Sequence, residues 1–246
     1  MYNFFVKPEA ITGDSITITG TDVNHIKNVL RMKSGEQVYV STGEDAVAYD
    51  CRITEISDEH VTCQINGILE EGLELPSDIY LFQGLPKGDK MEFIIQKAVE
   101  LGVHQIIPVS MKRCVVKLDE KKGKSKVARW QSISEAAAKQ SKRRLIPKIA
   151  DVMTFREALE MAKDFEVKMI PYESAEGMQK TKKMISQIQP GQKIGIFIGP
   201  EGGIDENEIA LAMENGMEPV TLGRRILRTE TAGMTAISWI MYHLEN

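Results

Sequence analysis

The sequence predicts a two-domain α/β protein, in which a small N-terminal β-barrel precedes a larger domain built on a parallel sheet. Up to residue 74 the chain carries short alternating apolar runs separated by turn residues, a pattern typical of β-strands. From residue 79 onward, strand-length apolar runs alternate with helix-length patterns, which is typical of parallel βαβ units. A polar, proline-containing stretch at 70–78 separates the two patterns, so we predict domains at 1–74 and 75–246.

The first domain is predicted to hold short strands around a single helix. The helix begins near Asp22 and ends around Gly35, because glycine commonly follows the last turn of a helix. The predicted strands lie at 4–6, 15–20, 37–40, 47–56 and 60–69.

The second domain is predicted to alternate strands with well-delimited helices. Its strands lie at 79–85, 105–109, 167–172, 193–198 and 219–222. A capping box, in which the first residue and the third after it satisfy each other's backbone amides, marks three helix starts. Gly102 and Gly216 are predicted helix ends, the lysine-rich stretch at 120–126 is predicted to be a mobile loop, and a final apolar helix covers 232–244. The three boxes are Asp89 with Glu92, Thr154 with Glu157, and Asp205 with Glu208.

Charge is distributed unevenly along the chain. The net charge is −4, yet residues 112–148 hold 13 Lys and Arg against three acids. A mostly acidic protein that presents one basic face to a polyanion would have this distribution. The alternative is a solvated surface helix with its preceding loop.

Composition argues against several other classes of protein. No apolar run is long enough for a membrane span and the N-terminus lacks a signal-peptide layout, so we expect a cytoplasmic protein. The three cysteines and four histidines have no metal-ligand spacing, and we expect neither a metal nor a disulfide.

The stretch IGPEGGIDENEI at 198–209 follows a predicted strand and precedes a helix start. Its glycines remove side chains where the chain turns sharply or where a ligand approaches backbone amides. The lysine of a phosphate-binding loop and the spacing of a dinucleotide fingerprint are both missing, so a nucleotide triphosphate fits poorly. A tight turn without a ligand is the alternative.

A second unusual stretch, LGRRILRTETAG at 222–233, places three arginines among apolar residues just before the final helix. Taken alone, it is also consistent with a loop whose arginines pair with nearby acids.

Together the two stretches resemble the RsmE family of ribosomal RNA methyltransferases, which belongs to the SPOUT trefoil-knot superfamily. The resemblance covers nearly the whole chain. Further matching stretches are FF at 4–5, HIKNVLRMKSGE at 25–36, KGDKMEFIIQKAVELGV at 87–103, RCVVKL at 113–118 and RWQSISEAAAKQSKR at 129–143.

The resemblance implies a C-terminal SPOUT α/β trefoil-knot domain, a PUA-like RNA-binding barrel at the N-terminus and a homodimer. The knot would hold the cofactor S-adenosylmethionine. The final apolar helix, with Trp239 and Ile240, would be a candidate dimer interface, with a core helix as the alternative. The cofactor-binding residues would be Pro171, Gly199, Pro200, Glu201, Gly202, Gly203, Leu222, Gly223, Ile226 and Leu227.

The family methylates N3 of a uridine in 16S (small-subunit) ribosomal RNA, and the partner would be this RNA, either naked or in an assembled small ribosomal subunit. N3 of uracil carries an imide proton, so a base, or a cation that stabilises the uracil anion, is required. Arg228 is our candidate for the electrostatic role. Glu230 is our candidate base, although it could instead brace the last helix.

Basic residues in both domains are candidates for RNA contact. Asn3 stands where the family usually has an arginine, so the contact that this arginine would carry is not assumed here. The residues Lys27, Arg31 and Lys33 would form a basic strip, with a solvated face as the alternative. The phosphate-binding candidates in the basic segment are Arg113, Lys117, Lys142, Arg143 and Arg144.

Two other functions remain open at this point. A ribose 2′-O-methyltransferase of the same superfamily would need an acceptor site for a hydroxyl. A non-catalytic RNA-binding assembly protein would keep the basic segment without the cofactor, and the two intact motifs argue against it.

Overall fold

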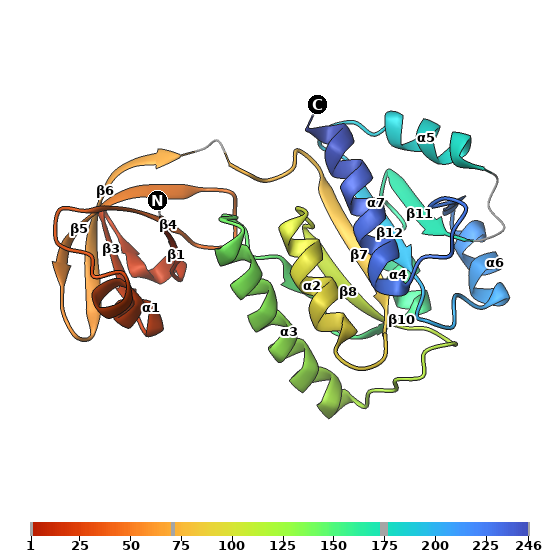
Figure 1. Cartoon of the computed structure of the whole chain (residues 1–246), viewed down its shortest axis with the longest axis horizontal. Coiled ribbons are helices and arrows are strands. Elements are labelled where there is room, and N and C mark those ends of the chain that lie inside the picture. Colours follow the sequence, from red (N-terminus) through yellow and green to blue (C-terminus); the bar gives the residue numbers. More distant parts are fainter. Residues whose placement is uncertain (1, 70–71, 173–176, 246) are drawn as a thin grey trace. The chain divides into compact units, whose positions relative to one another are not determined.

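The structure, a computed structural model, describes residues 2–69, 72–172 and 177–245 (Figure 1). The chain divides into two compact units. The first comprises Met1–Glu74 together with Ala138–Ile146, and the second comprises Leu75–Ala137 with Pro147–Asn246. The sequence prediction had assigned 138–146 to the second domain.

The first unit is a curled, mainly antiparallel sheet of six strands in the order β1-β4-β5-β6-β3-β2 (Figure 1). Inward-facing side chains alternate along its strands and form the core, which includes Ile16, Ile18, Val38 and Val40. All five strands predicted for this domain are present. Their bounds are β1 Asn3–Phe5, β2 Ile11–Thr12, β3 Ser15–Thr19, β4 Gln37–Ser41, β5 Ala48–Ile56 and β6 His60–Leu69.

The helical segment of the first unit is shorter than predicted. A turn of α-helix, α1 (Thr21–Asn24), continues as a π-helical turn at His25–Val29, and a 3-10 turn lies at Pro8–Ala10. The expected end near Gly35 is wrong, because Arg31 adopts a left-handed backbone with φ 53° and ends the helix. Val23 and Ile26 still bury the inner face of this segment.

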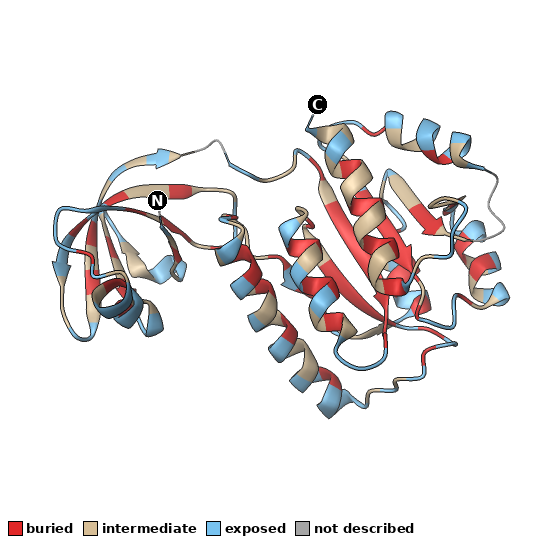
Figure 2. Ribbon diagram, in the orientation of Figure 1, coloured by how far each residue is buried: buried red, intermediate tan, exposed pale blue. Residues whose placement is uncertain are grey.

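The second unit contains a seven-stranded sheet in which all recorded strand pairs are parallel. Six strands follow the order β10-β8-β7-β12-β11-β13, and β9 pairs with β8. The side chains of β7 and β12 are almost entirely buried, as expected of parallel strands covered on both faces (Figure 2). The strands are β7 Asp78–Gly84, β8 Gln105–Ser110, β9 Lys148–Ile149, β10 Met153–Thr154, β11 Val167–Pro171, β12 Lys193–Ile198 and β13 Glu218–Val220.

In the described parts of the chain, five helices connect these strands, one of them (α3) ending in the first unit, and a sixth, α7, follows the last strand. Helices α2 and α7 pack against each other and α7 contacts β7 and β12, while α4 packs beside β8 and β10 (Figure 1). None of the described helices is long and apolar enough to cross a membrane. The helices are α2 Lys90–Glu100, α3 Glu120–Gln140, α4 Phe155–Met161, α5 Met178–Ser186, α6 Glu206–Glu214 and α7 Thr229–Leu244.

Two of the three predicted capping boxes are present. Thr154 caps α4 and Asp205 caps α6, each with the reciprocal glutamate bond. Asp89 makes no side-chain cap bond with a described residue, because its backbone (φ −95°, ψ 10°) is not in the extended conformation of a capping residue. Glu92 instead pairs with Arg129 on α3, at 2.8 Å between Oε1 and Nε.

The predicted mobile loop at 120–126 is wrong, since these residues form the first turns of α3. The side chain of Asp119 accepts a hydrogen bond from the Lys122 amide at 2.8 Å, and Lys124 pairs with Glu120 one turn away. Farther along the helix, buried Trp130 and Ser134 anchor it to the unit. Tertiary packing of this face stabilises a helix that its lysine-rich start would not form alone.

Candidate active site

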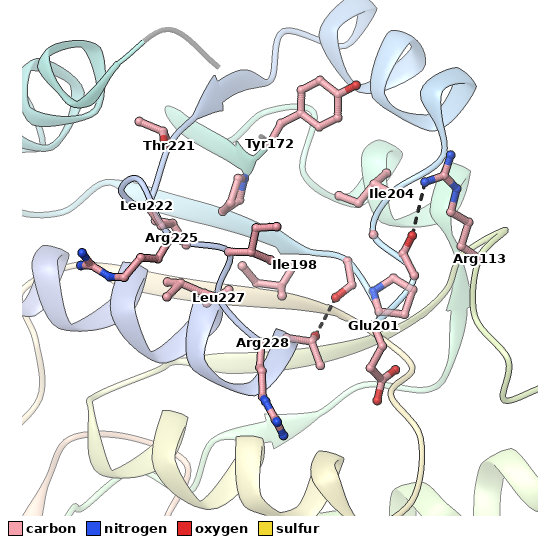
Figure 3. Close-up of a pocket in the computed structure, with 18 of the residues that line it drawn as sticks. Arg113, Tyr172, Ile198, Glu201, Ile204, Thr221, Leu222, Arg225, Leu227 and Arg228 are labelled. Atoms are coloured by element: carbon pink, nitrogen blue, oxygen red, sulfur yellow. Dashed lines mark hydrogen bonds between the residues drawn. The ribbon is translucent and has the colours of Figure 1, made fainter. Parts of the chain in front are cut away.

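A cavity of about 690 Å³ lies at the carboxyl ends of β11, β12 and β13 (Figure 3). Ligands of open parallel sheets bind at this edge. Its lining residues come from the loops that follow these three strands and β8, and from the starts of α2, α6 and α7. They include all ten residues predicted to bind a cofactor, from Pro171 to Leu227, together with Arg113 and Arg228.

The glycine-rich turn that forms one wall needs its glycines for steric reasons. A Cβ atom on Gly199 would lie 2.7 Å from Cγ1 of Ile204, and one on Gly202 would lie 3.3 Å from Cβ of Arg113. Gly203 has a φ of 71°, which favours glycine. The turn is therefore folded tightly on itself before any ligand is considered.

The end of β7 packs closely against this turn. A Cβ on Gly84 would lie 2.8 Å from both the nitrogen and Cδ of Pro200, so Gly84 permits the two backbones to approach. No local sequence pattern predicts this contact, because 116 residues separate Gly84 from Pro200.

A buried chain of hydrogen bonds joins β7, the glycine-rich turn and α7. Gln83, fully buried, donates from Nε2 to the Thr229 hydroxyl at 2.8 Å. Thr229 donates in turn to the Gly199 carbonyl at 2.6 Å, a bond drawn as a dashed line in Figure 3. The other Gln83 donor bond goes to the Gly84 carbonyl at 3.0 Å. Neither Gln83 nor Thr229 was among the predicted site residues, although both fix the position of predicted ones.

In the loop before α7, three backbone amides have no hydrogen-bond partner among the described residues. No described residue accepts a hydrogen bond from the amides of Leu222, Ile226 or Leu227. Ile226 is 84% exposed, which is unusual for a large apolar side chain. Unpaired donors beside apolar side chains are the combination that a flat heteroaromatic ligand requires.

Charged groups gather at another part of the cavity. Nζ of Lys90 lies 3.0 Å from Oε1 of Glu201 and 3.5 Å from Oε2 of Glu230. Burial alone would raise the pKa of Glu201, but hydrogen bonds from Lys90 and from the Glu201 and Lys87 amides outweigh it and hold that pKa below its usual value. The Glu201 hydrogen bond raises the pKa of Lys90, so the ammonium is retained.

The two predicted catalytic residues occupy different positions. Arg228 is exposed, lines the cavity and directly precedes α7, and no described residue pairs with its guanidinium. Glu230 is not among the lining residues, and its side chain is only 16% exposed. Figure 3 shows Arg228 and Glu201 pointing the same way, away from Thr221 and Leu222.

Arg113, predicted as a phosphate-binding residue, lies at the rim of the cavity. Its Nη1 donates to the Gly202 carbonyl at 3.3 Å, and its Nε lies 3.8 Å from Asp205 (Figure 3). The neighbouring Lys112 binds Asp205 at 3.0 Å, and this hydrogen bond lowers the pKa of the aspartate. The loop after β8 therefore braces the glycine-rich turn.

The other RNA-binding candidates differ in accessibility. Lys117 lies in the second unit and is exposed, and Arg31, Lys33 and Lys142 are exposed residues of the first unit. Lys27 is engaged by Asp58.

The neighbouring arginines Arg143 and Arg144 serve the first unit itself. Arg143 is 3% exposed, with its guanidinium bound by Glu74. Arg144 donates to the Leu69 carbonyl at 2.7 Å. Both side chains therefore stabilise the junction of 138–146 with the sheet.

Known proteins resemble the chain over its whole length. Residues 73–241 match a family model described as an RNA methyltransferase domain, and 18–66 match one described as an RNA methyltransferase PUA domain. A ribosomal RNA small subunit methyltransferase E of Bacillus subtilis is 39% identical, over 100% of this chain and 98% of the relative. Its counterpart in Synechocystis is 32% identical over 100% of this chain and 78% of the relative.

Two solved structures extend the likeness to the fold. A ribosomal RNA small subunit methyltransferase E from Neisseria gonorrhoeae, bound to S-adenosylmethionine, is 34% identical with a TM-score of 0.81, covering 97% of this chain and 96% of that one. A putative methyltransferase from Legionella pneumophila, in complex with the same cofactor, is 31% identical with a TM-score of 0.82, covering 98% and 96%. With its cavity formed by the two motif loops, its PUA match and these full-length relatives, the chain belongs to the ribosomal RNA small subunit methyltransferase E (RsmE) family.

Proposed function

We propose that this protein uses S-adenosylmethionine to methylate N3 of a uridine in small-subunit ribosomal RNA. The observation that carries the proposal is the meeting of the glycine-rich turn and the LGRRIL loop in one cavity. Full-length relatives named for methylation of small-subunit ribosomal RNA support the reaction, and two relatives solved with the cofactor support its identity.

The residues of the cavity fit S-adenosylmethionine. A volume of about 690 Å³ lies within the range of small-molecule sites. Adenine would lie among Pro171, Leu222 and Leu227, where the unpaired amides can bind its edge. The polar amino-acid part would face the charged residues around Glu201. When bound, the cofactor supplies a methyl group made electrophilic by its sulfonium.

The residues of this chain then have two tasks, to position the base and to stabilise its charge. Arg228 is exposed at the cavity with no described partner, so its guanidinium is available to a carbonyl oxygen or phosphate of the RNA. Such preorganised cations stabilise negative charge that develops on the base.

RNA contacts outside the cavity are proposed for the exposed cations Arg31, Lys33, Lys117 and Lys142. Contacts of lysine and arginine with phosphates fix orientation and confer little sequence selection. Arg143 and Arg144 are left out of this surface, because their guanidinium groups are used within the first unit.

Three further proposals follow from membership of the family. The close approach of Gly84 to Pro200, and the bonds that join Gln83, Thr229 and Gly199, support the trefoil knot. A homodimer would use exposed Phe93 of α2 and Tyr242 of α7, whereas Ile240 is fully buried in its own unit. A ribosomal RNA substrate places the protein in the cytoplasm.

Calorimetric titration with S-adenosylmethionine tests the cofactor site. Leu227→Trp fills the cavity from a half-buried lining position without a new backbone strain, and Met213→Trp adds the same ring at an exposed position of α6 as its matched control. We expect micromolar binding by the wild type and by Met213→Trp, and loss of binding in Leu227→Trp. Absence of binding by folded wild type, with or without RNA, would contradict the proposal.

Mapping of the transferred group tests the acceptor. Methyl-labelled cofactor is incubated with 16S ribosomal RNA and, separately, with small ribosomal subunits, and digested nucleosides are identified by mass spectrometry. Label on N3 of uridine is expected. Label on a ribose hydroxyl would indicate a 2′-O-methyltransferase, and RNA binding without label would indicate an assembly protein.

A further inference from the structure

Lys90 brings together three segments that lie far apart in the sequence. It is the first residue of α2, and its ammonium contacts Glu201 of the glycine-rich turn and Glu230 of α7. The Nζ–Oε distances are 3.0 Å to Glu201 and 3.5 Å to Glu230. Of the three, Lys90 and Glu201 line the cavity, and Glu230 does not.

The two carboxylates hold the ammonium and are themselves engaged. Glu201 also accepts a hydrogen bond from the Lys87 amide at 3.1 Å. Oε2 of Glu230 is buried and has no hydrogen-bond partner among the described residues, so the ion pair with Lys90 is what compensates its charge. Glu230 therefore influences the cavity only through its ion pair with Lys90.

An ammonium group has three N–H donors and no acceptor. Two donors of Lys90 can serve the two carboxylates, which leaves one for a ligand. The side chain is 34% exposed and lines the cavity, so this donor is accessible. Because the neighbouring carboxylates favour the charged form, the group acts as a fixed cation and not as a proton acceptor.

We propose that Lys90 is a catalytic cation that donates a hydrogen bond to a carbonyl oxygen beside N3 of the target uracil and stabilises the base as its imide anion. This inference rests on the proposed function. Glu201 and Glu230 are positioning residues that hold the ammonium, and Glu230 does not take the proton itself.

The imide proton passes to solvent water, and the negative charge is shared between N3 and the two carbonyl oxygens. The N3 electron pair then forms the bond to the methyl carbon. The carbon–sulfur bond breaks with its electron pair left on sulfur, which changes from a sulfonium to a neutral thioether.

A neutral side chain at this position should slow methyl transfer without preventing cofactor binding. Removing one preorganised donor from a developing anion costs about 100-fold in rate. We expect that fall in the single-turnover rate of Lys90→Met at a saturating cofactor concentration, where a change in the cofactor dissociation constant does not affect the comparison. Lys97→Met is the matched control, because Lys97 lies on the same helix, pairs with Glu100 and is absent from the cavity lining.

Two readouts separate a catalytic role from a structural one. Without the cation the anion forms only at higher pH, so the plateau of the rate against pH should shift upward in Lys90→Met. Substrate in which 5-fluorouridine replaces uridine has a more acidic N3–H and should recover much of the lost rate. Lys90→Gln retains a neutral donor to Glu201 and serves as the second variant if the methionine variant does not fold.

The outcomes are distinct. An upward pH shift with recovery on fluorinated RNA supports the inference. An unchanged rate and pH profile overturns it, and so does an equal rate loss on both RNAs with an unchanged profile, which indicates a structural role. A wild-type protein that transfers no methyl group to N3 overturns the proposed function, and this inference with it.

Discussion

Thr229→Val removes a hydroxyl from the buried chain of hydrogen bonds while keeping the size and branching of the side chain. The Gly199 carbonyl loses the donor at 2.6 Å, and Nε2 of Gln83 loses the acceptor at 2.8 Å. Each buried polar group left unpaired costs roughly 1–3 kcal/mol, so we expect a loss of about 3 kcal/mol in the free energy of unfolding. For a unit of this size, that loss lowers the melting temperature by roughly 6–12 °C.

Differential scanning calorimetry of three proteins measures this effect. Thr229→Ser is the matched control, because it keeps the hydroxyl and loses one methyl group, at a cost of about 1 kcal/mol. The double variant Gln83→Met/Thr229→Val should be less destabilised than the sum of its single changes, since both partners of one bond are then apolar. Our reasoning is refuted if Thr229→Val melts no lower than Thr229→Ser.

Three other predictions concern separate features of the second unit and the cysteines. Gly84→Ala should weaken cofactor binding at least about tenfold in calorimetric titration, because the added Cβ would displace Pro200. Gly67→Ala in the first unit should leave cofactor binding unchanged, because the space around Gly67 is open. Glu201→Gln should lower the melting temperature near pH 7. Because the folded state lowers the pKa of Glu201, the carboxylate stabilises the fold above the ordinary value of 4.5, and this stabilisation is lost as the pH falls through the folded-state pKa. A difference in melting temperature from the wild type that persists undiminished at about pH 3 would contradict this. Burial raises the pKa of Cys51 to about 12 and that of Cys63 to about 11, and it also raises the pKa of Cys114. Ellman's reagent at about pH 8 should therefore label none of these three thiols in the native protein and all of them in urea. Rapid labelling of the native protein would contradict this prediction.

Local rules in the sequence predicted the elements well where local interactions decide. The alternating runs located the longer strands, and the boxes at Thr154 and Asp205 formed because the cap and its glutamate are three residues apart. The box at Asp89 did not form because the Asp89 backbone is not extended, and Glu92 pairs instead with Arg129, a partner on another helix. The start of α3 was taken for a loop because its composition is lysine-rich, and the buried Trp130 and Ser134 that anchor the helix lie farther along the chain.

Site residues that belong to a sequence motif could be predicted, whereas residues that reach the site through tertiary contacts could not. The two motif stretches supplied nine of the ten cofactor-binding predictions, the tenth being Pro171 at the end of β11, and the structure places these residues around one cavity. Lys90 gave no signal, since its partner carboxylates lie 111 and 140 residues farther along the chain. Gln83 could not be predicted either, because it is a single polar residue within an apolar strand pattern.

The first unit consists of two segments that are separated in the sequence, and this has a consequence for its biosynthesis. Its sheet is translated by residue 74, yet Ala138–Ile146, which carries the Arg143 partner of Glu74, emerges 72 residues later. At a synthesis rate of roughly 5–20 residues per second, the interval is about 4–14 s. During this time the nascent N-terminal sheet lacks its final segment, while most of the chain up to α3 of the other unit has been made. The N-terminal unit is therefore not an autonomous first product of the ribosome, and its completion depends on the chain that follows it.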